Sequence, residues 1–287
     1  MSILEQVQQA TFVYFGFDPA GEDKDNIWLA TPALCISDDG INWVPIAEFP
    51  QLGNLRDGYI QQIGDDYWIT GTLAIFKTND FINFEYHSLD VLNQPNYWDI
   101  WAPEFVLDRE SNQWKLIYCA NHWGVNLYLA DFDPQTGNVT NPYQEIDLPI
   151  SVIDPDVVYL NGSYLLAGGG GHLFVSDRLN GPYREIETDL QQTGANWYEA
   201  AELLVVDDKI LFYQDKITGK VPDINDSGDM VYATASVDDL TNWTKNKLVK
   251  CAINMRHGSF IYNGKAPYQE EYFPNIAPNT TFGTQVI

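Results

Sequence analysis

Acidic residues recur at the start of apolar segments along this chain of 287 residues. They are Asp57 in "LRDGYI", Glu104 in "WAPEF", Asp154 in "VIDPDVV", and Glu199 with Glu202 in "WYEAAELL". Carboxylates that lie close together repel one another, and burial near a like charge raises the pKa of at least one of them. Cleavage of a glycosidic bond needs such a set, with one protonated carboxyl and one ionised carboxylate. A single Asp beside Gly or Pro is often only a turn residue, so the recurrence is what favours chemistry.

Tryptophans lie close in sequence to these acids, at Trp98, Trp101, Trp123 and Trp197. An aromatic ring can stack on the apolar face of a sugar while carboxylates accept hydrogen bonds from its hydroxyls. Trp is also common in the core of β proteins, so no single ring decides the matter. Acids and tryptophans together predict a sugar-binding pocket.

These side chains can act together only if the fold brings their segments to one place. Short runs such as "DDYWITGT" and "KILFYQD" alternate with the period of two that is typical of half-buried strands. A small polar residue followed six or seven positions later by an aromatic one recurs in "SDDGINW", "TNDFINF", "SDRLNGPY" and "SVDDLTNW", with a degraded copy in "ADFDPQTGNVTNPY". Five copies at intervals of roughly 45 residues indicate four-stranded units of the size of a propeller blade.

The sequence therefore predicts an all-β protein, a five-bladed β-propeller over residues 1–287, with a short helical turn in "SILEQVQQA" near the N-terminus. A β-sandwich or a pair of barrels is the alternative, but neither explains the repeat. The first strand of a propeller blade lines the central channel, so the acids should converge there. Glu202, three residues beyond Glu199, is expected on the opposite face of its strand.

Composition excludes several classes of partner. A net charge of -25 disfavours nucleic acids and anionic membranes, which are bound through Lys and Arg. The N-terminus has no basic region before its apolar part, so a cytoplasmic location is expected. Three widely spaced cysteines with apolar neighbours favour buried free thiols over a disulfide framework. The sequence indicates no oligomeric state.

A set of motifs in order along the chain resembles glycoside hydrolase family 43, the five-bladed propeller family of arabinofuranosidases and xylosidases. "RDGYIQQIGDDYWITGT" is similar to a family pattern that begins Arg-Asp-Pro, and "IWAPEF" is similar to Trp-Ala-Pro-Glu. "SVIDPDVVYLNGSYLL" contains the family's Ile-Asp, "WYEAAELLVVDDKILFYQD" stands where the family has Glu-Gly-Pro, and "MRHGSF" contains Arg-His-Gly. "FVYFGF" and "ALCISDDGINW" match the first blade.

Carried over by position, the resemblance implies that Asp57 is a general base and Glu199 a general acid. Asp154 would be an auxiliary acid that orients Glu199 and tunes its pKa. Family members invert the anomeric configuration, which implies that base and acid lie about 6.5 to 9.5 Å apart to admit water. Two departures stand out, because Gly58 replaces a proline after the base and Ala200 with Ala201 replaces the Gly-Pro after the acid.

The resemblance also implies a substrate pocket and an ion. The expected substrate-binding residues are Trp101, Glu104, Trp123, Trp197 and Arg256. His257 in "MRHGSF" matches a histidine near the propeller axis, where many family members hold a water-coordinated cation, often Ca2+. No cofactor is expected to be required for the chemistry.

The expected function is that of an inverting exo-glycosidase that removes a terminal pentose, α-L-arabinofuranose or β-D-xylose, from oligosaccharides. One alternative is a carbohydrate-binding propeller without turnover. Another is a related propeller glycosidase acting on a different sugar, such as fructose or galactose. The fructose alternative needs a nucleophile in the first blade, where "FGFDPAGED" offers Asp18 as the candidate.

Overall fold

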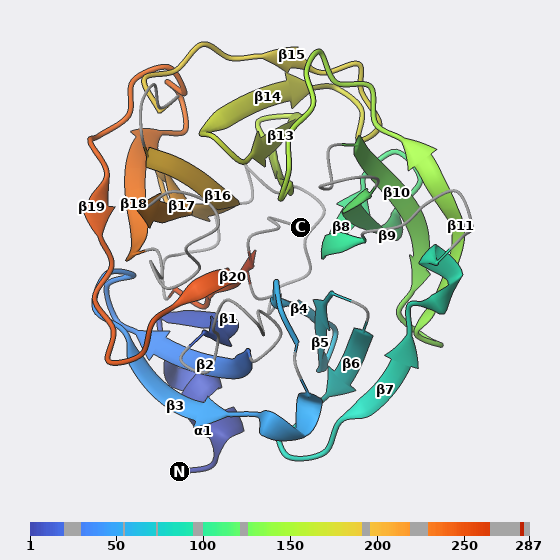
Figure 1. Ribbon diagram of the computed structural model, residues 1–287, viewed down its shortest axis with the longest axis vertical. Coiled ribbons are helices and arrows are strands. Elements are labelled where there is room, and N and C mark those ends of the chain that lie inside the picture. Colours follow the sequence, from blue (N-terminus) through green and yellow to red (C-terminus); the bar gives the residue numbers. More distant parts are fainter. Residues whose placement is uncertain are drawn as a thin grey trace.

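The computed structural model describes residues 1–19, 30–53, 55–72, 74–93, 100–120, 126–190, 196–218, 229–264 and 282–283. Within these residues the strands form five antiparallel sheets that stand around a common axis (Figure 1). The prediction of an all-β, five-bladed propeller is confirmed.

Four of the blades are built from consecutive strands that follow one another from the axis outward. The first contains β4 (Tyr59–Ile63), β5 (Asp66–Gly71), β6 (Ala74–Thr78) and β7 (Glu85–Ser88). The second contains β8 (Trp101–Asp108), β9 (Gln113–Ala120), β10 (Asn126–Asp133) and β11 (Asn138–Glu145). The third contains β12 (Asp156–Leu160), β13 (Ser163–Gly168), β14 (His172–Ser176) and β15 (Arg184–Glu185). The fourth contains β16 (Asn196–Val206), β17 (Lys209–Thr218), β18 (Asp229–Ser236) and β19 (Lys247–Leu248).

The closing blade joins the two ends of the chain. It contains "FVYFGF" and "ALCISDDGINW", the motifs that come first in the sequence. Its strands run outward from β20 (Arg256–Tyr262) through β1 (Phe12–Asp18) and β2 (Thr31–Ser37) to β3 (Val44–Glu48), and β21 (Phe282–Gly283) pairs with the other edge of β20. The strand of this blade that faces its neighbours at the axis therefore comes from "RHGSF" and not from "FVYFGF". Contacts between the innermost strands close the circle in the order β20, β4, β8, β12, β16 and back to β20.

The recurring polar-to-aromatic element forms the turn between the third and fourth strands of a blade. In the closing blade, Ser37 Oγ accepts a hydrogen bond from the Gly40 amide at 3.0 Å, and Asp39 Oδ1 accepts one from the Asn42 amide at 2.8 Å. The indole of Trp43 then donates to the Gly40 carbonyl at 3.0 Å, which turns the ring inward. The turn is thus held by its own side chains. Equivalent contacts hold the turns around Thr78, Asp80 and Asn83 and around Ser236, Asp239 and Asn242.

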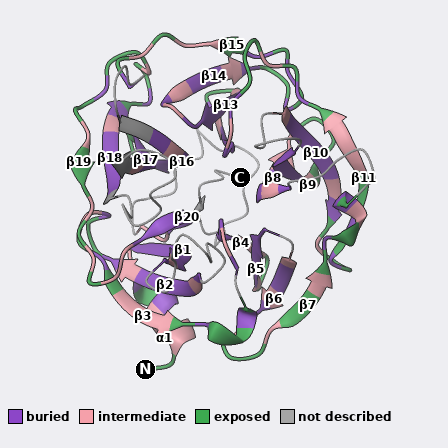
Figure 2. Cartoon of the chain, viewed as in Figure 1, coloured by how far each residue is buried: buried purple, intermediate pink, exposed green. Residues whose placement is uncertain are grey.

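Apolar side chains fill the spaces between blades. Each sheet is therefore buried on both faces, whereas its outermost strand is more exposed (Figure 2). Between the closing blade and the first blade, for example, Phe15 and Leu34 pack with Ile60 and Ile69. Similar clusters lie at the other interfaces between neighbouring blades. Burial of this apolar surface is the main force that holds the blades in a ring.

Short helices lie outside the sheets. The helix α1 (Ile3–Gln9) begins at a capping box in which Ser2 and Glu5 exchange hydrogen bonds, and its buried Val7 packs on the closing blade. This confirms the predicted N-terminal helical turn. Two 3-10 helices, η1 (Pro50–Leu52) and η2 (Asp90–Leu92), follow the outer strands of two blades. No helix in the described part of the chain is long and apolar enough to cross a bilayer.

Glycines allow the closing blade to approach the first blade closely. Gly58 and Gly258 form a parallel bridge between the entrances of β4 and β20. A Cβ at Gly258 would lie 2.4 Å from the Phe15 carbonyl oxygen and 2.6 Å from the Gly16 Cα. A Cβ at Gly58 would lie 3.0 Å from the Phe15 ring. The departure from proline at Gly58 therefore falls where the strand entrances leave little room for a side chain.

Substitution of Gly258 tests the close approach of β20 to β1 within the closing blade. We expect Gly258→Ala to lower the free energy of unfolding by at least about 2 kcal/mol, because the added methyl meets backbone atoms that cannot rotate away. The matched control is Gly162→Ala, where φ is +86° and no atom lies within 4 Å, so that only backbone strain of about 1 kcal/mol is added. Urea unfolding of both variants makes the comparison. Equal losses would show that the approach at Gly258 is not tight.

Candidate active site

Each innermost strand has one non-glycine residue with a left-handed backbone at its entrance. These residues are Asp57, Ala102, Asp154, Ala200 and His257, with φ between 27° and 52°. In β8 and β16 the register shifts at the same point, between Trp101 and Glu104 and between Glu199 and Glu202. A left-handed conformation is uncommon outside glycine, so its recurrence marks one equivalent position in all five blades.

This position sorts the polar side chains at the axis into two sets. The entrance set occupies the left-handed position or the residue before it, and consists of Asp57, Asp154, Glu199, Arg256 and His257. The buried set lies two residues after that position, and consists of Glu104, Asp156 and Glu202. The exposed fraction of the buried set is 2% or less, whereas the Glu199 side chain is 32% exposed. The predicted acids thus converge on the axis, but they occupy two different positions along the innermost strands.

The bulge in β16 corrects the expectation for Glu202. Two consecutive residues, Ala200 and Ala201, lie between Glu199 and Glu202. Glu199 pairs with Asp215 and Glu202 with Tyr213 on β17, whereas the two alanines between them have no register partner there. Because the extra residue breaks the alternation of the strand, both glutamates face the axis. Glu199 lies beside Arg256, whereas Glu202 lies among the buried set next to His257.

Asp57 and His257 form the closest ion pair of the entrance set. His257 Nδ1 lies 3.0 Å from Asp57 Oδ1, and the Thr72 hydroxyl donates to Asp57 Oδ2 at 2.7 Å. His257 Nδ1 also lies 4.0 Å from Asp154 Oδ2, which accepts a hydrogen bond from the Ala200 amide at 3.0 Å. The left-handed Ala200 therefore has a role, since its amide orients Asp154. A glycine there, as in the family pattern, would adopt this conformation at lower cost.

Arg256 joins the entrance set to a carboxylate that the sequence analysis did not select. Arg256 Nε donates to Asp215 Oδ2 at 2.8 Å, and the His257 amide donates to the same oxygen at 3.1 Å. Arg256 Nη2 lies 3.8 Å from Glu199 Oε2. Asp215 ends the apolar run "KILFYQD" and is fully buried, and this unusual position was the available signal.

The two carboxyls expected to do acid and base chemistry have opposite pKa shifts. Burial works against ionisation of Asp57, but the His257 imidazolium and the Arg56 guanidinium hold its pKa below the usual range. Burial, followed by the charge of Asp154, raises the pKa of Glu199 to about 7, against the opposing charge of Arg256. Near neutral pH, Asp57 is ionised while a large share of Glu199 carries a proton.

The pKa values of His257 and Asp154 are also shifted at the entrance. Burial lowers the pKa of His257, but the charges of Asp57 and Asp154 outweigh it and raise that pKa to about 9. Burial raises the pKa of Asp154, and the charge of His257 opposes the shift. His257 is therefore a cation at neutral pH and compensates the acids around it.

The buried set contains three carboxyls in contact. Burial raises the pKa of all three, to about 7 for Asp156, and the mutual charges of the set raise those of Glu104 and Glu202 further. One oxygen of each carboxyl has no hydrogen-bond partner, although the Leu203 amide donates to Asp156 Oδ2 at 2.6 Å. These groups need protons or a cation to be stable where they lie.

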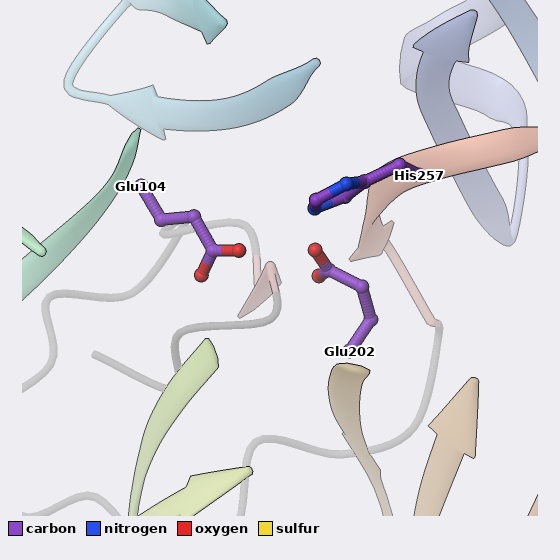
Figure 3. Close-up of side chains that lie close together, drawn as sticks. All are labelled: Glu104, Glu202 and His257. Atoms are coloured by element: carbon purple, nitrogen blue, oxygen red, sulfur yellow. The ribbon is translucent and has the colours of Figure 1, made fainter. Parts of the chain in front are cut away.

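Glu104, Glu202 and His257 point toward one another (Figure 3) and offer ligand atoms within 4.8 Å of one another. Calcium takes oxygen ligands, so the two carboxylates with their unpartnered oxygens fit this ion. A histidine nitrogen is not a usual calcium ligand, which agrees with an imidazole that acts through water. The residues at the axis therefore fit the expected cation.

The remaining predicted residues are placed as follows. Trp101 opens β8 directly before Ala102, at the position equivalent to Glu199 and Arg256, and is partly buried. Trp98, Trp123 and the side chain of Trp197 lie outside the described residues. Asp18 ends β1, the second strand of the closing blade. It therefore does not lie on an innermost strand.

Solved structures that are similar to this chain include glycoside hydrolases. An endo-1,4-β-xylanase from Bacteroides thetaiotaomicron has a TM-score of 0.54 and 16% identity, over 72% of this chain and 84% of that one. A family 43 β-1,3-galactosidase solved with galactodeoxynojirimycin has a TM-score of 0.52 and 11% identity, over 72% and 81%. An exo-β-1,3-galactanase from Clostridium thermocellum has a TM-score of 0.50 and 15% identity, over 72% of this chain and 54% of the longer one.

The chain has the fold of glycoside hydrolase family 43. No family model matches the sequence, and no curated protein sequence does. The family 43 likeness is thus one of architecture.

The buried set makes stability depend on pH. A carboxyl whose pKa is raised by folding stabilises the protein most below its unfolded pKa, and this contribution is lost as pH rises through the folded value. We therefore expect the melting temperature to fall from pH 4 toward pH 7 in the presence of a chelator, the window set by Asp156. Glu202→Gln removes one of these carboxyls, so the decline should be smaller.

Calorimetry across this pH range measures the effect, with Glu110→Gln as the control because that side chain is exposed. Added Ca2+ should raise the melting temperature of the wild type at pH 7 more than that of Glu202→Gln. Parallel curves for wild type and Glu202→Gln would contradict the assignment of raised pKa values to the buried set.

Proposed function

We propose that this chain is an inverting glycoside hydrolase in which Asp57 is the general base and Glu199 the general acid. The observation that carries the proposal is the opposite shift of these two pKa values at one partly exposed entrance. Pairs of carboxyls whose surroundings separate their pKa values are typical of glycosidic cleavage. The glycoside hydrolases of the same fold support it.

In the proposed mechanism each residue of the entrance set has one task. Asp57, oriented by Thr72 and His257, accepts a proton from a water molecule that attacks the anomeric carbon. Glu199 donates its proton to the leaving oxygen as the glycosidic bond breaks. Asp154 keeps Glu199 protonated through its charge. Arg256 restrains the Glu199 carboxylate after the proton has left.

A cation at the buried set, when bound, would lower the local negative charge and the pKa values of nearby carboxyls. Glu104 and Glu202 would hold it, with His257 contributing through water. His257 would then link the buried set to Asp57, since its Nδ1 faces Asp57.

The proposed substrate is the terminal pentose of an oligosaccharide, α-L-arabinofuranose or β-D-xylose, with Trp101 at the entrance as a stacking surface. Galactose is the second candidate, because two of the similar structures are a β-1,3-galactosidase and an exo-β-1,3-galactanase. A sugar-binding propeller without turnover would have no need for two carboxyls with opposed pKa values.

A panel of aryl glycosides tests the function. We expect turnover of one among α-L-arabinofuranoside, β-D-xyloside, β-D-galactoside and fructoside, and a loss of at least about 10³-fold in kcat for Asp57→Asn. Asp57→Asn is the sharper variant, because an activated aryl leaving group needs little protonation and would hide the loss of Glu199. Binding of a sugar without hydrolysis by the wild type would favour the non-catalytic propeller.

The pH profile of kcat/KM tests the role of Asp154. The wild type should lose activity as pH rises through about 7, where Glu199 gives up its proton. Asp154→Asn removes a charge that raises this pKa, so the basic limb should move to lower pH. The readout is kcat/KM for a substrate with a poor leaving group, which requires the acid. An unchanged basic limb would show that Asp154 does not tune Glu199.

A further inference from the structure

Two of the three cysteines lie side by side although 216 residues separate them. Cys35 is buried in the middle of β2, and Cys251 is partly buried in the segment between β19 and β20. Their sulfur atoms are 3.9 Å apart. A disulfide bond requires a sulfur separation of about 2 Å, so the two sulfur atoms must approach by about another 2 Å.

The backbone on both sides holds the two thiols in this position. The Lys250 amide donates to the Ile41 carbonyl at 2.8 Å, and the Trp43 amide donates to the Lys250 carbonyl at 2.7 Å. These bonds attach the residue before Cys251 to the turn that follows β2. The Val249 amide in turn donates to the Met230 carbonyl of the fourth blade at 2.9 Å. The proximity of the thiols is therefore part of the packing between two blades.

Reagents can reach Cys251 from solvent. Cys251 lines a pocket of about 340 Å³ that opens at the surface, together with Met230, Val249, Ile253 and Met255 among others. Cys35 lies behind Cys251 and is fully buried. Access is thus ordered, since an oxidant in the pocket meets Cys251 first.

The two thiols differ in acidity, and the accessible thiol of Cys251 is the more acidic one. The hydrogen bond between the two thiols, with help from the amides of Ile253 and Ala252, lowers the pKa of Cys251 to about 7. The same contact and burial raise the pKa of Cys35. The accessible sulfur is the better nucleophile near neutral pH, because the thiolate is the reactive form.

We propose that Cys35 and Cys251 form a dithiol site that a low-molecular-weight disulfide converts to an intramolecular disulfide. The Cys251 thiolate attacks one sulfur of the external disulfide and forms a mixed disulfide, while the other half leaves as a thiolate and takes up a proton. The Cys35 thiol then loses its proton and attacks the Cys251 sulfur, which releases the second small thiol. Two protein thiols are oxidised and one external disulfide is reduced to two thiols.

The disulfide bond would cross-link the N-terminal and C-terminal parts of the chain where they close the ring. It would tie β2, from the N-terminal part of the closing blade, to the segment that leads into β20, the C-terminal strand of the same blade. Arg256 and His257 follow that segment directly, so the cross-link would also fix the entry of the strand that carries both cations of the entrance set. A cross-link over so long a loop restricts the unfolded chain strongly.

Incubation of the native protein with oxidised glutathione tests the proposal. We expect two of the three thiols to be lost, a peptide pair linked through Cys35 and Cys251 in a digest without reductant, and Cys119 unmodified. The melting temperature should rise by roughly 5 °C and return on addition of a reductant. Wild type that keeps all three thiols, or that holds glutathione on Cys251 without a linked peptide, would overturn the proposal.

Two variants separate the steps. Cys35→Ala removes the second nucleophile, so glutathione should stay attached at Cys251. Cys251→Ser, changed at the partly exposed position, should keep both remaining thiols under the same conditions. Circular dichroism confirms folding before each reaction. Rapid loss of the Cys35 thiol in Cys251→Ser would show that Cys251 is not the site of entry and would contradict the mechanism.

Discussion

The axis of this propeller holds more buried carboxyls than cations, and the rest of the site follows from that imbalance. Among the described residues, Asp57, Asp154, Asp156, Glu104, Glu202 and Asp215 are buried near the axis, where Arg256 and His257 supply the positive charge. The carboxyls next to a cation can stay ionised. Those further away must bind a proton or an added ion, because ionised carboxylates without compensation are unstable in a low-dielectric interior. Two carboxyl groups at one site can therefore act as an acid and a base, because their surroundings differ.

Both cations come from the strand that closes the ring. Arg256 and His257 are consecutive residues at the entrance of β20, which pairs with β1 only after the C-terminal part of the chain has reached the N-terminal blade. Before that pairing, Asp57 and Asp215 have neither of these partners. The formation of the site is thus coupled to ring closure, and a covalent link between β2 and the segment before β20 would act on the same event. Packing of the blades and compensation of charge therefore both require the closed ring.

Much of the architecture could be predicted from the sequence, because the turns between third and fourth strands are held by local side-chain contacts. Ser37 and Asp39 hydrogen-bond within their own turn, so their spacing survives as a repeat. The convergence of the acids followed from the blade geometry. The position of Glu202 did not, since a bulge at Ala200 reverses the strand alternation and leaves no mark in a single sequence.

Contacts between distant segments were also beyond the sequence. Asp215 faces the axis through its pairing with Glu199, and Cys35 meets Cys251 through the packing of two blades. The first contact depends on the register of β16 and β17, which a bulge shifts, and the second depends on the closed ring. Asp215 could be noticed in the sequence, because it is a carboxylate at the end of an apolar strand. Its partner could not be predicted in the same way.

We expect the axial network to keep Asp57 ionised and a large share of Glu199 protonated in the same molecule near neutral pH. Carbon-13 NMR of side-chain carboxyls, titrated in wild type and assigned with Glu199→Gln and Asp57→Asn, measures both values directly. A Glu199 resonance that titrates near pH 7, with Asp57 still ionised at the lowest pH at which the protein is folded, is the predicted result. Ordinary pKa values for both carboxyls, near 4, would contradict it.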